Sequence, residues 1–218
     1  MRTRNFALAV ALLFATVPLA AQTPRVEIIG RAVWFHPTQG NSSFTLDDDF
    51  SSGFDSKFGY GLGLNIYVVG PLSVELSASV IKPKYTVQLL DSAGPSSTRT
   101  LRTIPVTAGL QYHFCPGMMF DPYVGGGAVY VDFARADNGA DLALDDVGSL
   151  EIDRNKTGWM ANAGLTIGIT RNFAANLDGK YLGVSPVTRV VFVRGDFTAS
   201  RRIRFDPVLL SAGFSVRF

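Results

Sequence analysis

The sequence predicts an all-β fold: an eight-stranded antiparallel transmembrane β-barrel, an up-and-down meander with short periplasmic turns and long extracellular loops. Three observations predict it. Apolar residues recur at every second position, short turns alternate with long polar segments, and the non-apolar faces carry few charges. Alternating segments of about ten residues with this connection pattern are typical of strands that cross an outer membrane. With 218 residues, 47% of them hydrophobic, the chain is one domain rather than a disordered polymer.

The first 21 residues have the composition of an export signal. Arg2 and Arg4 precede an apolar run over residues 6–17, and small residues lead to Gln22. The apolar run is shorter than the roughly 20 residues of a membrane-spanning helix. We therefore expect residues 1–21 to be a removed signal peptide and residues 22–218 to be the barrel domain in the bacterial outer membrane. Removing Arg2 and Arg4 cancels the formal charge of +2, and a neutral chain argues against nucleic acid as a partner.

The first four strands follow from alternation and turn residues. The opening run places Val26 and Ile28 on one face and Glu27 on the other. The second run is separated from the third only by Gly70 and Pro71, a pair typical of a tight turn. The fourth alternates Thr, Gly, Gln and His with apolar residues before the Cys115-Pro116-Gly117 turn. The predicted strands cover residues 26–34, 58–68, 72–80 and 103–114.

The last four strands repeat this arrangement. A fifth run softened by Gly125, Gly126 and Gly127 is followed by a long polar segment. The sixth and seventh runs meet at a turn near residue 171, and the eighth ends at the last residue, Phe218. These strands cover residues 123–133, 158–170, 173–181 and 208–218. The long loops are expected at residues 36–57, 83–101, 134–157 and 184–205.

The faces of the strands distinguish a membrane barrel from a soluble one. A soluble barrel exposes a heavily charged outer surface, whereas here the non-apolar face is mostly Gly, Ser, Thr and Asn. Aromatic residues at strand ends fit the two interfacial girdles of a membrane barrel. They are Trp34, Phe58, Tyr112, Phe114, Trp159, Phe173 and Phe218.

The predicted lumen is narrow, because eight strands leave space only for side chains or one small ligand. The candidate lumen-lining residues are Glu27, Arg31, Gly59, Gly61, Gly63, Glu75, Asp178, Lys180 and Arg217. The three glycines either leave room beside Tyr67 or Tyr130, or only relieve crowding and allow curvature. The charges either gate or bind a solute, or pair into a structural plug, since isolated charges in a narrow interior must be paired.

Three segments resemble the outer-membrane protein W family. They are Ile104 to Phe114, Asp121 to Tyr130, and Asp206 to Phe218. The resemblance implies a Gram-negative outer-membrane barrel that passes small, mainly hydrophobic molecules. The ending with Phe214, Val216 and Phe218 is similar to the signal read by the assembly machinery. The expected partners are therefore that machinery and periplasmic chaperones, outer-membrane lipid and lipopolysaccharide, and small hydrophobic solutes.

Two functional alternatives remain beside the conduit. One is a non-conducting structural or surface-interaction barrel whose extracellular loops bind lipopolysaccharide, phage or host surfaces. The other is a lipid-modifying enzyme, which needs a base beside a nucleophile. The only two histidines, His36 and His113, are predicted at opposite ends of the barrel and cannot share a site. A His113–Ser or His36–Ser pair remains conceivable, but a single His at a barrel rim is more often an interfacial polar residue. The sequence therefore predicts no enzyme, and it predicts no cofactor and no metal site.

Overall fold

The computed structural model describes residues 26–38, 42–44, 50–89, 96–135, 149–152, 155–184, 187–191, 198–202 and 206–218. The expected signal peptide, residues 1–21, lies outside these ranges, as does the expected start of the mature domain. Within the described residues, no helix is long and apolar enough to span a membrane.

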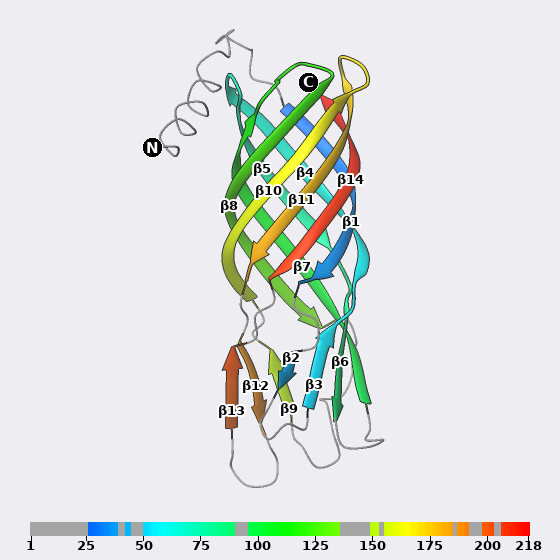
Figure 1. The fold of residues 1–218 in the computed structure, drawn as a ribbon, viewed down its shortest axis with the longest axis vertical. Coiled ribbons are helices and arrows are strands. Elements are labelled where there is room, and N and C mark those ends of the chain that lie inside the picture. The colour runs from blue at the N-terminus through cyan, green and yellow to red at the C-terminus, as the bar shows by residue number, and fades with distance from the viewer. Residues whose placement is uncertain are drawn as a thin grey trace, which may run out of the picture.

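Eight long strands form a closed antiparallel barrel, which confirms the predicted fold class (Figure 1). Each barrel strand pairs with the next one along the chain, and β14 pairs with β1 to close the ring. The eight strands are β1 (Val26–Pro37), β4 (Lys57–Val69), β5 (Leu72–Val80), β7 (Ser96–His113), β8 (Phe120–Arg135), β10 (Asn155–Gly168), β11 (Phe173–Gly183) and β14 (Pro207–Arg217).

Three short turns lie at the end of the barrel that also holds the C-terminus (Figure 1). Gly70 and Gly117 have φ values of 52° and 84°, a left-handed conformation that favours glycine and permits such tight reversals. In the third turn, Thr170 Oγ1 accepts hydrogen bonds from the backbone N–H groups of Asn172 and Phe173 at 3.3 and 3.0 Å. Short turns are periplasmic in outer-membrane barrels, and we call this end the periplasmic end.

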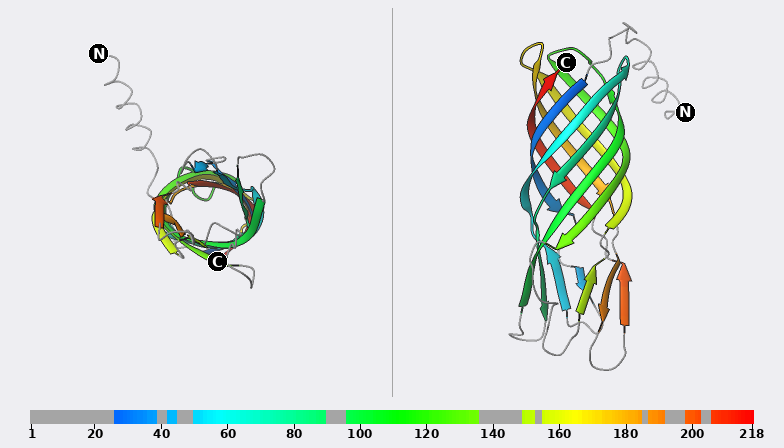
Figure 2. Two further views of the ribbon diagram at one scale, coloured as in Figure 1. Left: turned by 90° about the horizontal axis from the view of Figure 1, so that it is seen from below. Right: turned by 180° about the vertical axis from the view of Figure 1, so that it is seen from behind.

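The segments expected as loops contain further strands, which corrects the prediction. At the other end of the barrel, β6 pairs with the start of β7, and β3 pairs with β6. Strand β12 pairs with β9 and β13 in a separate sheet (Figure 2). Residues 84–89 alternate polar and apolar residues, a period of two that is typical of a strand. The alternation is easily overlooked because the surrounding segment is rich in polar residues. The short strands are β2 (Ser42–Phe44), β3 (Phe50–Phe54), β6 (Lys84–Leu89), β9 (Ser149–Ile152), β12 (Val187–Val191) and β13 (Thr198–Arg202).

Burial alternates along the barrel strands and separates two faces. The outward positions carry exposed apolar side chains, as a lipid-facing wall requires. Exposed aromatic residues lie towards both ends of this wall, with Phe58, Tyr60 and Trp159 at one end and Phe173 and Phe218 at the other. The inward positions hold both charged and apolar side chains that are almost fully buried, and they form the candidate functional site.

Candidate functional site

The barrel interior is divided into two layers. Along β1 the inward residues are Glu27, Ile29, Arg31, Val33 and Phe35, all of them buried. The charged members lie towards the periplasmic end, and the apolar members Val33 and Phe35 lie towards the extracellular end. We call these layers the polar half and the apolar half of the interior.

Glu75 is the centre of the polar half. Its Oε1 accepts a charge-assisted hydrogen bond from Arg31 Nη2 at 2.6 Å. Its Oε2 accepts from Lys180 Nζ at 2.5 Å and from Gln111 Nε2 at 2.7 Å. Because β1, β5, β7 and β11 each supply one of these residues, the contacts cross the lumen rather than following one strand. A fully buried carboxylate is thereby neutralised and hydrogen-bonded, as burial of a charge requires.

Asp178 provides a second carboxylate beside the first. Its Oδ1 lies 3.4 Å from Lys180 Nζ and 3.7 Å from Arg31 Nη1. Its Oδ2 accepts hydrogen bonds from the Tyr123 hydroxyl at 3.0 Å and from Asn162 Nδ2 at 3.1 Å. The charges of Arg31 and Lys180 therefore balance those of Glu75 and Asp178. Tyr123 on β8 and Asn162 on β10 add two more strands to the same layer.

A third group of contacts lies nearer the periplasmic end. Glu27 Oε1 accepts from Arg217 Nε at 3.0 Å and from Ser215 Oγ at 2.6 Å. Asn176 Nδ2 donates to Ser215 Oγ at 2.8 Å, and Thr166 Oγ1 donates to Asn176 Oδ1 at 3.0 Å. This chain links β1, β14, β11 and β10 across the point where the barrel closes.

His113 is the centre of a buried chain of Ser, His and Asp. Ser73 Oγ lies 3.1 Å from His113 Nε2, and His113 Nδ1 lies 2.8 Å from Asp121 Oδ2. The Tyr67 hydroxyl also approaches Nδ1, at 3.5 Å. The order of contacts resembles that of a serine hydrolase, but Ser73 and His113 are both 0% exposed. The Ser73 oxygen is therefore closed to a substrate in this structure, and the contacts join β4, β5, β7 and β8 within the polar half.

The apolar half is filled by side chains from the extracellular ends of the strands. Its apolar members form one packed cluster, and Thr103, the bridge partner of Ile81, is buried at the same level. The members of the cluster are Val33, Phe35, Ile81, Val129, Val131, Phe133, Met160, Leu182, Val184 and Leu209.

Of the two interpretations of the β4 glycines, the structure favours relief of crowding over local room. A Cβ atom on Gly63 would lie 3.0 Å from Arg31 Nη2, and one on Gly61 would lie 2.5 Å from Ser79 Oγ. One on Gly59 would lie 2.4 Å from a backbone carbonyl oxygen. These glycines therefore allow close approach of neighbours, which was the alternative interpretation. Tyr130 does not share their space, because it is 42% exposed on the outer face.

The six charged residues predicted to line the lumen all lie on inward positions. Four of them meet around Glu75, and Glu27 and Arg217 form a separate pair. The C-terminal residues Phe214 and Phe218 face outward and are about 70% exposed, and Val216 shares their face.

Sequence reasoning missed the neutral polar residues of the interior. They share the strand parity of the charged residues, and that parity is the signal that identifies them. They are Asn65, Ser73, Thr103, Thr107, Gln111, Tyr123, Asn162, Thr166, Asn176 and Ser215. His113 shares their inward position and was predicted only as a residue at one end of the barrel. His36 lies apart from them, exposed at the extracellular end, where its Nδ1 is 2.9 Å from Ser56 Oγ. No group of metal-ligating side chains occurs among the described residues.

A small cavity marks the boundary between the two halves. It has a volume of about 10 Å³, close to the smallest space that holds one water molecule. Arg31, Asp178 and Lys180 line it from the polar half, and Val33 and Leu209 line it from the apolar half. On the side formed by the neighbouring strands β5 and β7, the cavity is lined by Ser77, Pro105 and Thr107.

The ladder between β5 and β7 is interrupted at this level. Regular pairing ends at Ala78 and Val106, and the next contact is an isolated bridge between Ile81 and Thr103. Pro105 lies within the gap and has no N–H group to donate. Just below the gap, Ser77 Oγ and Thr107 Oγ1 are hydrogen-bonded at 2.7 Å.

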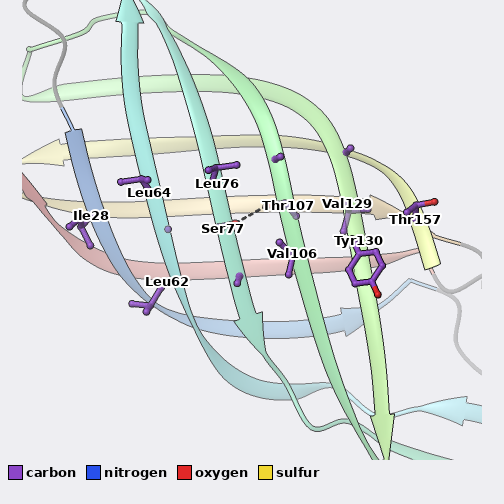
Figure 3. Close-up of a pocket in the computed structure, with 14 residues that line it drawn as sticks. Ile28, Leu62, Leu64, Leu76, Ser77, Val106, Thr107, Val129, Tyr130 and Thr157 are labelled. Atoms are coloured by element: carbon purple, nitrogen blue, oxygen red, sulfur yellow. Dashed lines mark hydrogen bonds between the residues drawn. The ribbon is translucent and has the colours of Figure 1, made fainter. Parts of the chain in front are cut away.

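The outer wall is hollowed at the same place. A groove of about 670 Å³ runs over β4, β5, β7 and β8 and is lined mainly by apolar side chains (Figure 3). Leu62, Leu76, Val106 and Tyr130 border it. Ser77 and Thr107 also line it, so these two residues separate the outer groove from the inner cavity.

Comparisons with known proteins agree with this architecture. The model of the OmpW family matches residues 30–218. The crystal structure of the outer membrane protein OprG from Pseudomonas aeruginosa is similar with a TM-score of 0.76 and 19% identity, covering 91% of this chain and 97% of that one. The solution structure of E. coli outer membrane protein W gives 0.54 and 20%, covering 90% and 99%. The outer membrane protein AlkL in lipid bilayers gives 0.58 and 21%, covering 94% of each chain. No curated protein sequence matches.

Proposed function

Since this chain belongs to the OmpW family, an outer-membrane barrel family, we propose that it gives small, mainly apolar molecules a narrow route across the outer membrane. The observation that carries the proposal is the division of the interior. The buried side chains at the extracellular side are mainly apolar, although Thr103 is also buried there, so this layer favours an apolar solute and disfavours an ion or a sugar. The narrow eight-stranded interior restricts the route to small molecules.

The polar half opposes further movement along the barrel axis. An apolar solute would have to break the contacts of Glu75 with Arg31 and Lys180, which would leave buried charges unpaired. The interrupted ladder at Pro105 provides a lower barrier, because fewer backbone hydrogen bonds hold β5 and β7 together there. We therefore place the exit of the solute in the wall at this gap, opening onto the apolar outer groove.

A reversible cross-link tests this route. Ser77 and Thr107 are register partners, so the double variant Ser77→Cys, Thr107→Cys forms a disulfide across the wall with acceptable geometry. The native Cys115 is replaced by Ser in the same protein. The oxidised protein in liposomes should lose the uptake of a small apolar solute, and reduction should restore it.

The reduced form of the same protein is the matched control. A charged solute of similar size should enter slowly in both forms. Equal uptake of the apolar solute by the oxidised and reduced forms would contradict a route through this wall. No uptake by the folded wild type would contradict the conduit itself.

A second candidate function is a non-conducting surface-interaction barrel. The packed interior favours it, as do the lengths of β7 and β8, 18 and 16 residues, which exceed the roughly 10 that cross a membrane. Replacing residues 136–148 with a short Gly-Ser turn separates the two functions. A conduit keeps its solute uptake after this change, whereas a surface-interaction protein loses its binding.

A further inference from the structure

We propose that the outer wall of the barrel binds lipid A, the diphosphorylated and multiply acylated anchor of lipopolysaccharide. Lys82, Lys84 and Arg102 bind its phosphates, and the apolar groove below them holds an acyl chain. This site uses the membrane-facing wall rather than the lumen, and its acyl chain lies in the same outer groove onto which the proposed solute route opens.

The three cations share one face of the wall. Burial alternates through this region, with Ile81, Pro83, Leu101 and Thr103 buried and the residues between them exposed. Since Ile81 and Thr103 face the interior, the exposed Lys82, Lys84 and Arg102 project outward. The Ile81–Thr103 bridge and the Lys84–Thr100 pair fix one register, in which Lys82 lies opposite Arg102.

This arrangement is unfavourable without an anion. Like charges placed opposite each other on neighbouring strands destabilise a sheet. Among the described residues, none of the three cations has a carboxylate within ion-pair distance. Two acids lie on neighbouring segments at this level. Asp132 has Ile104 rather than Arg102 as its register partner, and Asp55 lies opposite Lys84, whose carbonyl accepts a hydrogen bond from the Asp55 N–H at 3.0 Å. A phosphate group between Lys82 and Arg102 removes the repulsion, and the guanidinium can bind it through two parallel hydrogen bonds.

The groove begins four residues from the cations, towards the periplasmic end. Lys82 lies four residues beyond Ala78, between the end of β5 and the start of β6, and Arg102 lies four residues from Val106 on β7, in both cases towards the extracellular end. Four residues span about 13 Å along a strand. Ala78 and Val106 both line the groove, as do Ala108 and Ala128. These two small residues are register partners, so they hollow the wall where an acyl chain lies.

Charge and position together identify lipid A rather than a phospholipid. The cations lie at the extracellular side of the aromatic residues Tyr60 and Tyr130, where the head groups of the outer leaflet are found. Three cations on two adjacent strand segments exceed what one phosphodiester needs, and they suit a lipid with two phosphates. The groove then holds one of the several acyl chains of lipid A.

The test uses the full mature barrel refolded in detergent free of lipopolysaccharide, with bound lipid counted by native mass spectrometry. The probes are diphosphoryl lipid A, monophosphoryl lipid A, phosphatidylglycerol and inorganic phosphate. Wild type should bind diphosphoryl lipid A most tightly. The triple variant Lys82→Gln, Lys84→Gln, Arg102→Gln should bind it at least tenfold more weakly, and Lys57→Gln, which removes a cation at the same end of the barrel, should bind it normally.

A second pair of variants tests the groove separately. Ala108→Leu with Ala128→Leu should weaken lipid A binding several-fold, and Ala212→Leu on the opposite wall should not. The conservative variant Lys82→Arg, Lys84→Arg should retain binding, and gel migration of unboiled samples verifies the fold of each variant. Binding by the triple variant within twofold of wild type would overturn the proposal, as would equal affinity for phosphatidylglycerol and lipid A. Tight binding of inorganic phosphate alone would overturn the role of the groove.

Discussion

The polar and apolar halves of the interior share the same eight strands but are stabilised differently. In the polar half, Glu75 is contacted by three donors from three other strands, so each residue depends on several partners. In the apolar half, Phe35 and Leu182 belong to a cluster in which each side chain is held by packing. Loss of one group therefore leaves an unpaired charge in the first case and a cavity in the second.

The largest expected effect comes from the variant Glu75→Leu. It leaves Arg31 and Lys180 buried beside one remaining carboxylate, Asp178, so we expect a loss of about 3 to 5 kcal/mol in the free energy of unfolding. Urea unfolding in detergent micelles measures it, with the exposed Asp55→Asn as the control. A loss below about 1 kcal/mol would mean that water already solvates this layer.

A cavity in the apolar half should lower the free energy of unfolding somewhat less than Glu75→Leu does. Leu182→Ala removes a side chain that is 1% exposed, and we expect a loss of about 3 kcal/mol in the same unfolding measurement. Leu177→Ala, on the lipid-facing side of the same strand and 50% exposed, is the matched control and should cost less. Equal losses at the two positions would show that the apolar half is not closely packed.

The Ser73, His113 and Asp121 chain should have a smaller effect. Ser73→Ala leaves His113 Nε2 without its hydrogen-bond partner, and we expect a loss of about 1 to 2 kcal/mol in the free energy of unfolding. Incubation of wild type with an activated ester should give no hydrolysis above the rate of Ser73→Ala. Hydrolysis that depends on Ser73 would contradict a purely structural role and would show that this end of the polar half opens.

The smallest effect on stability is expected at the C-terminus. Phe218 is exposed, and its backbone exchanges hydrogen bonds with Val26 at 2.9 and 3.4 Å. Its deletion should change the free energy of unfolding by no more than about 1 kcal/mol but should slow assembly into the outer membrane. Pulse-chase labelling of cells, followed by gel electrophoresis of unboiled samples, measures the rate at which the folded barrel forms. Wild-type kinetics would remove Phe218 from the assembly signal.

The sequence predicts the eight barrel strands well because alternation and turn residues are local properties. The strands at residues 58–68 and 72–80 lie within observed strands, and the turn glycines Gly70 and Gly117 have the expected backbone conformation. The short strands outside the barrel were missed, since their polar composition resembles that of loops. Residues 84–89 show that alternation persists there and is the better guide.

The interior was predicted less completely, because pairing across the lumen depends on tertiary structure. Alternation places Arg31, Glu75 and Lys180 on inward positions, but it does not show that they meet. The neutral residues Gln111 and Asn162 could not be predicted as partners of the buried carboxylates, because a polar residue on the inward face does not by itself indicate such a contact. The space beside a glycine also depends on its neighbours, as the Arg31 side chain beside Gly63 demonstrates.

The division of the interior is tested most directly by NMR of the barrel in lipid nanodiscs with a small apolar nitroxide. Signal broadening reports where the nitroxide resides. The account predicts strong broadening of methyl groups in the apolar half, such as those of Val33, Leu182 and Leu209. It predicts weak broadening at Thr166 and Asn176 in the polar half. Equal broadening in both halves, or none in the apolar half, would contradict the claim that one half admits apolar solutes and the other closes the barrel.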